Sequence, residues 1–235
     1  MTSLNTIQTQ LRDIADPAIA LTSLRFFKTA PGQYGEGDIF LGIKVPTLRA
    51  LVKKFPDTSL KTISALLKSK FHEERLFALL LLIDFYQNTN EATKQSAYDL
   101  YLAHAEHINN WDLVDVSAPY IVGDFLANRP RKPLYQLALS TSLWERRIAI
   151  VSTFHFIRRN EFTDTLLIAE HLLPDNHDLI HKAVGWMLRE VGKRDQPIEE
   201  AFLQKHYQTM PRTMLRYAIE RFPETRRKQY LNGFA

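Results

Sequence analysis

Two short stretches decide the fold: EERL at residues 73–76 and ERRI at residues 145–148. Each stands near the start of a long segment with apolar residues at helical spacing. Arg75 and Arg147 are 72 residues apart, and Trp111 lies midway between them. Recurrence at roughly 35–45 residues is typical of two-helix HEAT or armadillo repeats. We therefore expect an all-α solenoid of HEAT-like antiparallel helix pairs, in which equivalent positions line one concave face.

Helical spacing of apolar residues continues along nearly the whole chain, and the breaks carry Pro, Asn, Asp and Gly. No stretch shows sustained strand alternation. We expect one domain over residues 1–235. The predicted helices cover residues 3–15, 17–28, 46–55, 59–69, 72–88, 91–107, 111–128, 132–140, 142–159, 161–173, 177–193, 196–208 and 212–222.

Composition narrows the class of protein. The chain is 45% hydrophobic and 24% charged, which is ordinary for a soluble protein. The absence of cysteine excludes disulfides, thiolate metal sites and cysteine nucleophiles. The longest apolar run, residues 76–83, is far below the ~20 residues that span a bilayer, and residues 1–11 lack a signal-peptide pattern. We expect a cytoplasmic protein without membrane contact, and a monomer because short solenoids have closed, polar ends.

The net charge of +4 is small, but its distribution is uneven. Spaced basic clusters suit a polyanion such as DNA, although solvated helix ends would produce the same pattern. The clusters crowd the C-terminal half of the chain and comprise Arg129, Arg131, Lys132, Arg146, Arg147, Arg158, Arg159, Arg189, Lys193, Arg194, Arg226, Arg227 and Lys228.

One glycine-rich segment, PGQYGEGD at residues 31–38, interrupts the helical pattern. A phosphate-binding loop would need a preceding strand and a following Lys-Ser/Thr pair, and neither is present. Glu36 and Asp38 would also repel phosphate. We expect a loop near the binding face.

The most informative segment is NNWDLVDVSAP at residues 109–119. On a helix, Trp111 and Asp115 are one turn apart and share a face, so the carboxylate is expected to lie partly shielded beside an indole. Pro119 cannot donate a hydrogen bond to the Asp115 carbonyl, which predicts a kink. The alternative is a core tryptophan, a capped aspartate and a tolerated proline.

Two further segments carry a tryptophan with cations, WERRIAI at 144–150 and KAVGWMLRE at 182–190. The Arg147 guanidinium could grip a phosphate through paired hydrogen bonds. Gly185 costs its helix about 1 kcal/mol relative to Ala, which close approach of a ligand or a neighbouring helix would rationalise. The alternative for each segment is a core or interface tryptophan with surface charges.

Histidines give little support for a metal. His177 and His181 are one turn apart, as in zinc proteases, but Asp178 and the residues around it supply neither the catalytic Glu nor an obvious third ligand. We expect no metal site and no cofactor.

Together these segments resemble the AlkD family of bacterial DNA alkylation-repair glycosylases, which are built of HEAT-like repeats. The resemblance covers most of the chain. It rests on FLGI at 40–43 with Pro46, WDxxD at 111–115 with Pro119 and Gly123-Asp124, WxxR at 144–147, and KAxGWxLRE at 182–190. Two departures stand out: Asn110 replaces the first of the family's paired tryptophans, and the segment at 31–37 is longer.

The resemblance implies that Asp115, Trp111 and Trp186 form the active cleft, with Arg147 beside it holding double-stranded DNA. It also implies 3-methyladenine and 7-methylguanine as substrates, excised without turning the lesion into a pocket. Other cations expected to bind DNA are Lys182, Arg158, Arg159, Arg189 and Arg194.

A mechanism follows as a hypothesis. A purine alkylated at N3 or N7 is cationic and can leave as a neutral base without a general acid, so one carboxylate suffices where two are usual. Asp115 would stabilise the oxocarbenium-like sugar and orient water, and each indole would add roughly 0.5–2 kcal/mol of cation–π stabilisation. No Schiff-base lysine signature is present, so we expect a monofunctional glycosylase.

Two other functions remain open at this point. A non-catalytic HEAT-repeat protein that binds damaged or branched DNA would use the same arginines, and release of free base separates it from the enzyme. A protein–protein adaptor would need an exposed apolar groove, and failure to bind DNA at low salt would favour it.

Overall fold

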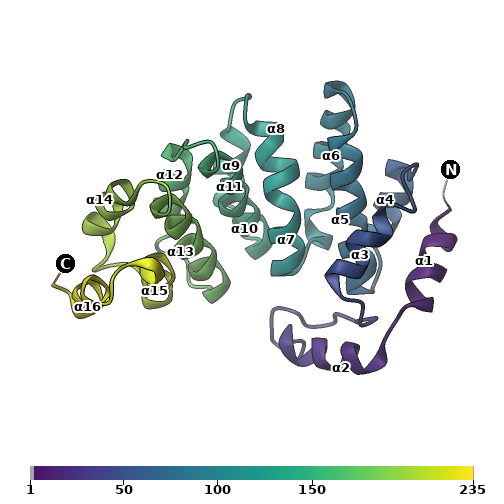
Figure 1. Ribbon diagram of the computed structural model, residues 1–235, viewed down its shortest axis with the longest axis horizontal. Coiled ribbons are helices and arrows are strands. Elements are labelled where there is room, and N and C mark those ends of the chain that lie inside the picture. Colours follow the sequence, from purple (N-terminus) through teal and green to yellow (C-terminus); the bar gives the residue numbers. More distant parts are fainter. Residues whose placement is uncertain (1–2, 235) are drawn as a thin grey trace. The chain divides into compact units, whose positions relative to one another are not determined.

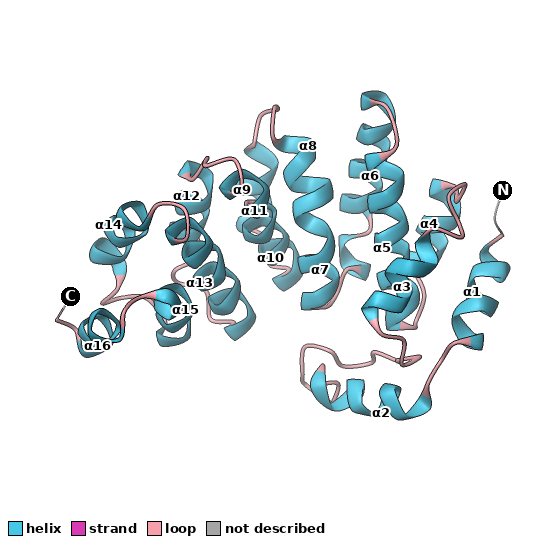
Figure 2. Cartoon of the chain, viewed as in Figure 1, coloured by secondary structure: helices cyan, strands magenta, loops and turns pink. Residues whose placement is uncertain are grey.

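The computed structural model describes residues 3–234. Within that range the regular structure is helical apart from one isolated parallel bridge between Ile39 and Phe71, which confirms the all-α prediction (Figure 2). The α-helices are α1 (Leu4–Asp13), α2 (Pro17–Phe26), α3 (Val45–Val52), α4 (Leu60–Leu67), α5 (His72–Gln87), α6 (Glu91–Ala103), α7 (Trp111–Ala118), α8 (Asp124–Leu126), α9 (Lys132–Ala138), α10 (Leu143–Ser152), α11 (Phe154–Ile157), α12 (Thr163–His171), α13 (Asp178–Gly192), α14 (Gln196–His206), α15 (Arg212–Ala218) and α16 (Glu224–Asn232).

The chain divides into two compact units, Met1–Ser117 and Ala118–Ala235. The single domain expected from the sequence therefore stays a prediction. In the first unit, α5 packs against α3, α4 and α6, and all but four of its sixteen residues are buried. In the second unit, α13 packs against α10, α12, α14 and α15 (Figure 1). Each unit thus has one long helix at its centre.

Three helices, α5, α10 and α13, are each preceded by a turn with the same hydrogen-bond pattern, here called the opening turn. Ser69, Ser140 and Asp175 each accept a hydrogen bond on the side chain from the N–H two residues ahead, at 3.1, 3.0 and 2.8 Å. The backbone carbonyl of the same residue accepts from a side chain six residues ahead, which is Arg75, Arg146 or His181. The helix begins three residues after the turn opens in every case, at His72, Leu143 and Asp178.

This turn corrects the register of the repeat. The sequence pattern makes Arg75 and Arg147 equivalent positions of two repeats. In the structure Arg146, not Arg147, is equivalent to Arg75, because Arg75 and Arg146 each bond the carbonyl six residues earlier. Ser140 follows Ser69 by 71 residues, and Asp175 follows Ser140 by 35. The two-helix period near Asp175 is therefore at the short end of the predicted range.

The helix that opens at Trp111 continues past Pro119. Residues Pro119–Gly123 form a π-helical turn that leads directly into α8, so the helix predicted over residues 111–128 is continuous through Leu126. A π-turn is a common way for a helix to absorb a disruption of its regular hydrogen bonds. The division between the two units falls just before this turn, between Ser117 and Ala118.

The packing of α13 explains its internal glycine. A Cβ on Gly185 would lie 2.4 Å from the Met214 carbonyl oxygen and 2.5 Å from the Tyr217 Cβ, both on α15. Of the two explanations drawn from the sequence, the close approach of a neighbouring helix is confirmed.

Helix α16 is not among the helices that the sequence predicted. It contains only one buried residue, Tyr230, and its other positions are almost all polar. A helix without an apolar stripe leaves no periodic signal to detect.

Candidate active site

The predicted catalytic pair lies on the first two turns of α7. Trp111 and Asp115 are both half-buried, one turn apart on the same helix, as the sequence predicted. The opposite side of α7 is anchored to α6, because the buried Tyr101 hydroxyl and the Ser117 hydroxyl are hydrogen-bonded at 2.9 Å. The helix therefore holds the carboxylate and the indole on its less buried side.

Asn110, one of the two departures from the AlkD pattern, has a structural role. It is fully buried, and its Oδ1 accepts a hydrogen bond from the Trp111 backbone N–H at 2.8 Å. Its Nδ2 donates to Asp38 Oδ2 at 3.0 Å. A tryptophan at this position could accept no hydrogen bond, so the start of α7 is fixed here by an amide.

Aromatic rings surround the Trp111 indole. The Phe27 ring stacks on it at an interplanar angle of 29°, with centroids 5.5 Å apart, and the exposed Phe26 ring meets it edge-on at 5.8 Å. Both geometries are among the favourable ones for aromatic pairs. The indole Nε1–H donates to the Tyr34 hydroxyl at 3.2 Å.

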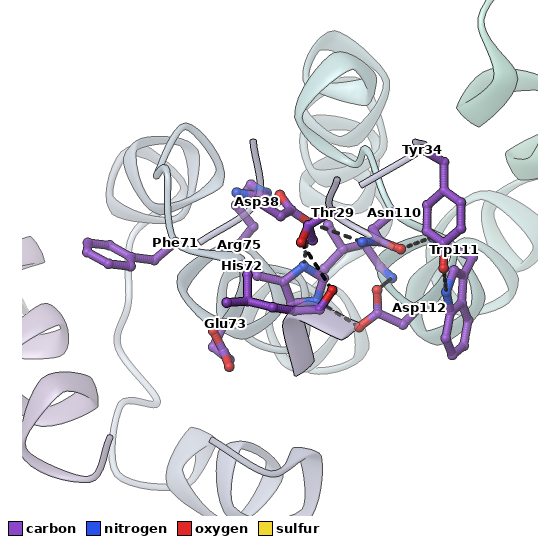
Figure 3. Close-up of polar contacts among 12 residues, drawn as sticks. Thr29, Tyr34, Asp38, Phe71, His72, Glu73, Arg75, Asn110, Trp111 and Asp112 are labelled. Carbon is purple, nitrogen blue, oxygen red and sulfur yellow. Dashed lines mark hydrogen bonds and ion pairs between the residues drawn. The ribbon is translucent and has the colours of Figure 1, made fainter. Parts of the chain in front are cut away.

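Next to this aromatic group lies a charge cluster formed by Asp38, His72, Arg75 and Asp112 (Figure 3). The first three are buried and Asp112 is half-buried. His72, on the first turn of α5, bridges the two carboxylates. Its Nδ1 is 3.0 Å from Asp38 Oδ2 and its Nε2 is 2.8 Å from Asp112 Oδ2. Arg75 also pairs with Asp38. Two cations against two carboxylates leave the cluster balanced, which a buried group of charges requires.

The cluster shifts the titration of its members. Burial lowers the pKa of His72, but the charge and hydrogen bond of Asp112, with those of Asp38, outweigh it and raise the pKa to about 9. Burial raises the pKa of Asp38, but the His72 hydrogen bond and the Arg75 charge bring it below its usual value. His72 is therefore an imidazolium at neutral pH, donating from both ring nitrogens.

The FLGI stretch at residues 40–43, one of the segments that carry the resemblance, is held in place by Glu73. The Glu73 carboxylate is buried and accepts hydrogen bonds from the backbone N–H groups of Leu41, Gly42 and Ile43, at 2.8, 2.8 and 3.2 Å. A carboxylate that takes up three backbone donors fixes the connection leading into α3. Because Glu73 adjoins His72, one turn of α5 holds both this connection and the charge cluster.

In the second unit, Trp186 lies half-buried on α13. Its Nε1–H donates to Glu190 Oε1 at 3.2 Å, and its ring is 5.8 Å from that of Phe154. Glu190 is buried and also accepts from Lys193 Nζ at 2.6 Å. Each candidate tryptophan thus has its indole N–H bonded within its own unit.

Arg147, which the resemblance places on the DNA-binding surface, is buried. Only 4% of it is exposed, and its Nη1 donates to the Leu179 carbonyl at 2.5 Å. Its neighbour Arg146 bonds Asp175 through Nε at 2.6 Å. The role of Arg147 in holding DNA stays a prediction.

The other predicted DNA-binding cations all contact groups of their own unit. Arg158, Arg159 and Arg194 are exposed, whereas Lys182 and Arg189 are half-buried. Their contacts are Lys182 with Asp178 at 2.7 Å, Arg159 with Glu161 at 2.9 Å, Arg189 with Glu220, Arg194 with the Glu190 carbonyl at 3.4 Å, and Arg158 over the rings of Phe154 and Tyr120.

The histidines considered as metal ligands bond to their own chain. His177 Nδ1 accepts from the Leu179 N–H at 3.1 Å, and His181 Nε2 donates to the Asp175 carbonyl at 2.5 Å. Among residues 3–234, no group of three or more His, Cys, Asp or Glu side chains is placed to hold a metal ion. Over the same residues, no helix is both long and apolar enough to cross a membrane.

Comparison with known proteins places these observations in a family. The family model for DNA alkylation repair enzymes matches residues 7–222. The chain belongs to this family. A predicted DNA alkylation repair enzyme from Enterococcus faecalis has a similar structure, with a TM-score of 0.70 and 17% identity, over 89% of this chain and 97% of that one.

A second solved structure, AlkD2 from Streptococcus mutans, gives a TM-score of 0.59 at 15% identity, over 94% of this chain and 100% of that one. No curated protein sequence matches the chain. The resemblance to the AlkD family and the helical-repeat solenoid fold are both confirmed. This DNA alkylation repair family member therefore has its predicted fold.

Proposed function

We propose that this family member is a monofunctional DNA glycosylase that hydrolyses the N-glycosidic bond of cationic alkylated purines, such as 3-methyladenine and 7-methylguanine, in duplex DNA. The observation that carries the proposal is the pair on α7, where the half-buried Asp115 carboxylate stands one turn from the Trp111 indole. Membership in a family of DNA alkylation repair enzymes supports it.

The chemistry needs few groups. The glycosidic bond breaks with both electrons going to the base, so a cationic purine leaves neutral and an oxocarbenium-like sugar remains. Asp115 stabilises that positive charge and orients a water molecule, whose oxygen bonds to C1′ while its proton passes to the carboxylate or to solvent. The face of the Trp111 indole adds cation–π stabilisation. Neutral bases are poor leaving groups and would be left untouched.

The wider assignments rest partly on the resemblance and partly on the composition and charge of the sequence. Trp186 serves as a second indole, and Arg147, Lys182, Arg158, Arg159, Arg189 and Arg194 bind double-stranded DNA. The whole chain acts as one glycosylase domain, as a cytoplasmic monomer, without cofactor. Phosphate contacts of this kind give salt-sensitive binding.

The test is release of free base from a duplex that carries one 7-methylguanine. Wild type should release the base, and Asp115→Asn should lose activity by about 10²- to 10³-fold, the range for removing one electrostatic contact to a transition state. Asp99→Asn, the same change at an exposed position on α6, is the matched control and should keep full activity. Binding to an undamaged duplex should be equal in all three proteins.

Release no faster than the spontaneous rate, with 3-methyladenine tested as well, would overturn the glycosylase proposal. Salt-sensitive DNA binding without base release would then leave a DNA-binding protein of the same family.

A further inference from the structure

The glycine-rich segment at residues 31–38 has no part in the proposed chemistry so far, yet it contacts the candidate active site. Tyr34, near its middle, is half-buried and accepts the Trp111 indole N–H at 3.2 Å (Figure 3). These two residues are 77 positions apart in the sequence. The segment therefore reaches across its unit to the first residue of α7.

The segment is shaped for this contact. Gly35 donates its backbone N–H to the Lys28 carbonyl at 3.2 Å, and a Cβ on Gly35 would lie 2.5 Å from the Phe27 carbonyl oxygen. Only glycine allows the backbone to approach that closely. The turn folds back on the end of α2, so Tyr34 and the stacked Phe27 ring are presented to the indole together.

The end of the segment is fixed by the charge cluster. Asp38 closes the segment, and Asp112 directly follows Trp111 in the sequence. His72 bonds both carboxylates, at 3.0 and 2.8 Å, and only 2% of it is exposed. Asn110, which precedes Trp111, bonds Asp38 directly. The indole is thus fixed through its N–H by Tyr34 and through its backbone by residues on either side.

We propose that Tyr34 and His72 are positioning residues for Trp111: the Tyr34 hydroxyl sets the plane of the indole, and His72 locks the segment that carries Tyr34 to the start of α7. The inference rests on the proposed function, which gives the indole face a role beside Asp115. An aromatic face stabilises a cation only when the cation lies over it, so rotation of the ring forfeits the interaction.

Tyr34→Phe tests the proposal, because it removes one hydroxyl and leaves the ring. The chain has three tryptophans, so a ¹H–¹⁵N correlation spectrum shows three indole N–H signals. The signal that disappears in Trp111→Phe is that of Trp111. In Tyr34→Phe the Trp111 signal should shift and exchange faster with solvent, with the other two unchanged. For 7-methylguanine release, kcat should fall about 2- to 30-fold, the range of a cation–π contact, with KM unchanged.

Tyr135→Phe is the matched control. Its hydroxyl bonds Asp164 at 2.7 Å in the second unit, so it loses a comparable hydrogen bond away from Trp111. It should leave the Trp111 signal and kcat as in wild type. His72→Gln should shift the Trp111 signal and lower kcat in the same direction as Tyr34→Phe. If it does not fold, Tyr34→Phe alone decides.

An unchanged Trp111 signal in Tyr34→Phe would overturn the positioning role, and so would a shifted signal with unchanged kcat. If wild type releases no base, the glycosylase proposal fails, and the Trp111 signal still decides whether Tyr34 holds the ring.

Discussion

The buried His72 predicts how the stability of the protein depends on pH. Its pKa is raised from 6.5 to about 9 in the folded protein. It contacts Asp38, Asp112 and the rings of Phe27 and Phe40, and Asp38 also pairs with Arg75. Because the folded state holds this proton more tightly than the unfolded chain, protonation stabilises the fold. That contribution is fully present below pH 6.5 and is lost as the pH rises through about 9.

The size of the effect follows from the shift. At 1.36 kcal/mol for each pKa unit, His72 contributes about 3 kcal/mol at pH 6 that is gone by pH 10. The steepest loss lies near pH 8, where the folded protein holds the proton and the unfolded chain has released it. A change of this size is a large part of the stability of an ordinary domain.

Urea unfolding of wild type and His72→Gln, measured at each pH unit from 6 to 10, checks the prediction. The free energy of unfolding of wild type minus that of the variant should fall by about 3 kcal/mol over this range. Titrating groups that do not contact His72 contribute equally to both proteins and cancel. A difference that stays constant with pH would refute the reasoning. If the variant is unfolded, an NMR titration of the His72 imidazole in wild type should still give a pKa near 9.

Two further predictions concern the second unit. Gly185→Ala gains about 1 kcal/mol of helix propensity, but its Cβ meets the Met214 carbonyl, and overpacking costs about 1–3 kcal/mol or more. Because the clashing atom is a backbone oxygen at 2.4 Å, the cost should lie at the upper end of that range, and we expect a net loss of about 2 kcal/mol in urea unfolding. Ala201→Gly, at an exposed helical position, should lose about 1 kcal/mol. A stabilised Gly185→Ala would contradict the packing. Burial, and then the Glu200 charge, raise the pKa of Glu199 to about 8. Wild type should lose stability as the pH rises from 4.5 through 8, so Glu199→Gln should become more stable relative to wild type with rising pH, and a pH-independent difference would refute this.

The helices were predictable because their signals are local. Apolar spacing and the Pro, Asn and Asp residues at the breaks fixed nearly every helix within a few residues, and Trp111 and Asp115 could be placed on one face by helix geometry alone. The register of the repeat was not predictable from letters. Two adjacent arginines compete at residues 146 and 147, and only the hydrogen bond to the Ser140 carbonyl selects the first.

The surroundings of Trp111 could not be predicted for a different reason. His72 is 34 residues from Asp38 and 40 from Asp112, and no local pattern connects them. The acidic character of Glu36 and Asp38 argues against phosphate binding, but it predicts neither the buried ion pair of Asp38 nor the contact made by Tyr34. A sequence shows which side chains a helix face carries, but not which distant loop folds over that face.

The opening turns have a consequence for how the second unit unfolds. Asp175 caps its own turn through the His177 N–H and also binds Arg146, which belongs to the preceding turn. In an ideal repeat array each module touches its neighbours only through packed helices, so modules can melt one at a time. Here the Asp175 carboxylate bonds groups in two successive modules, at the starts of α10 and α13. Unfolding of either turn breaks the Arg146–Asp175 ion pair and so removes a contact of the other turn. The amide hydrogens at the starts of α10 and α13 are therefore expected to exchange with solvent together, as one cooperative foldon.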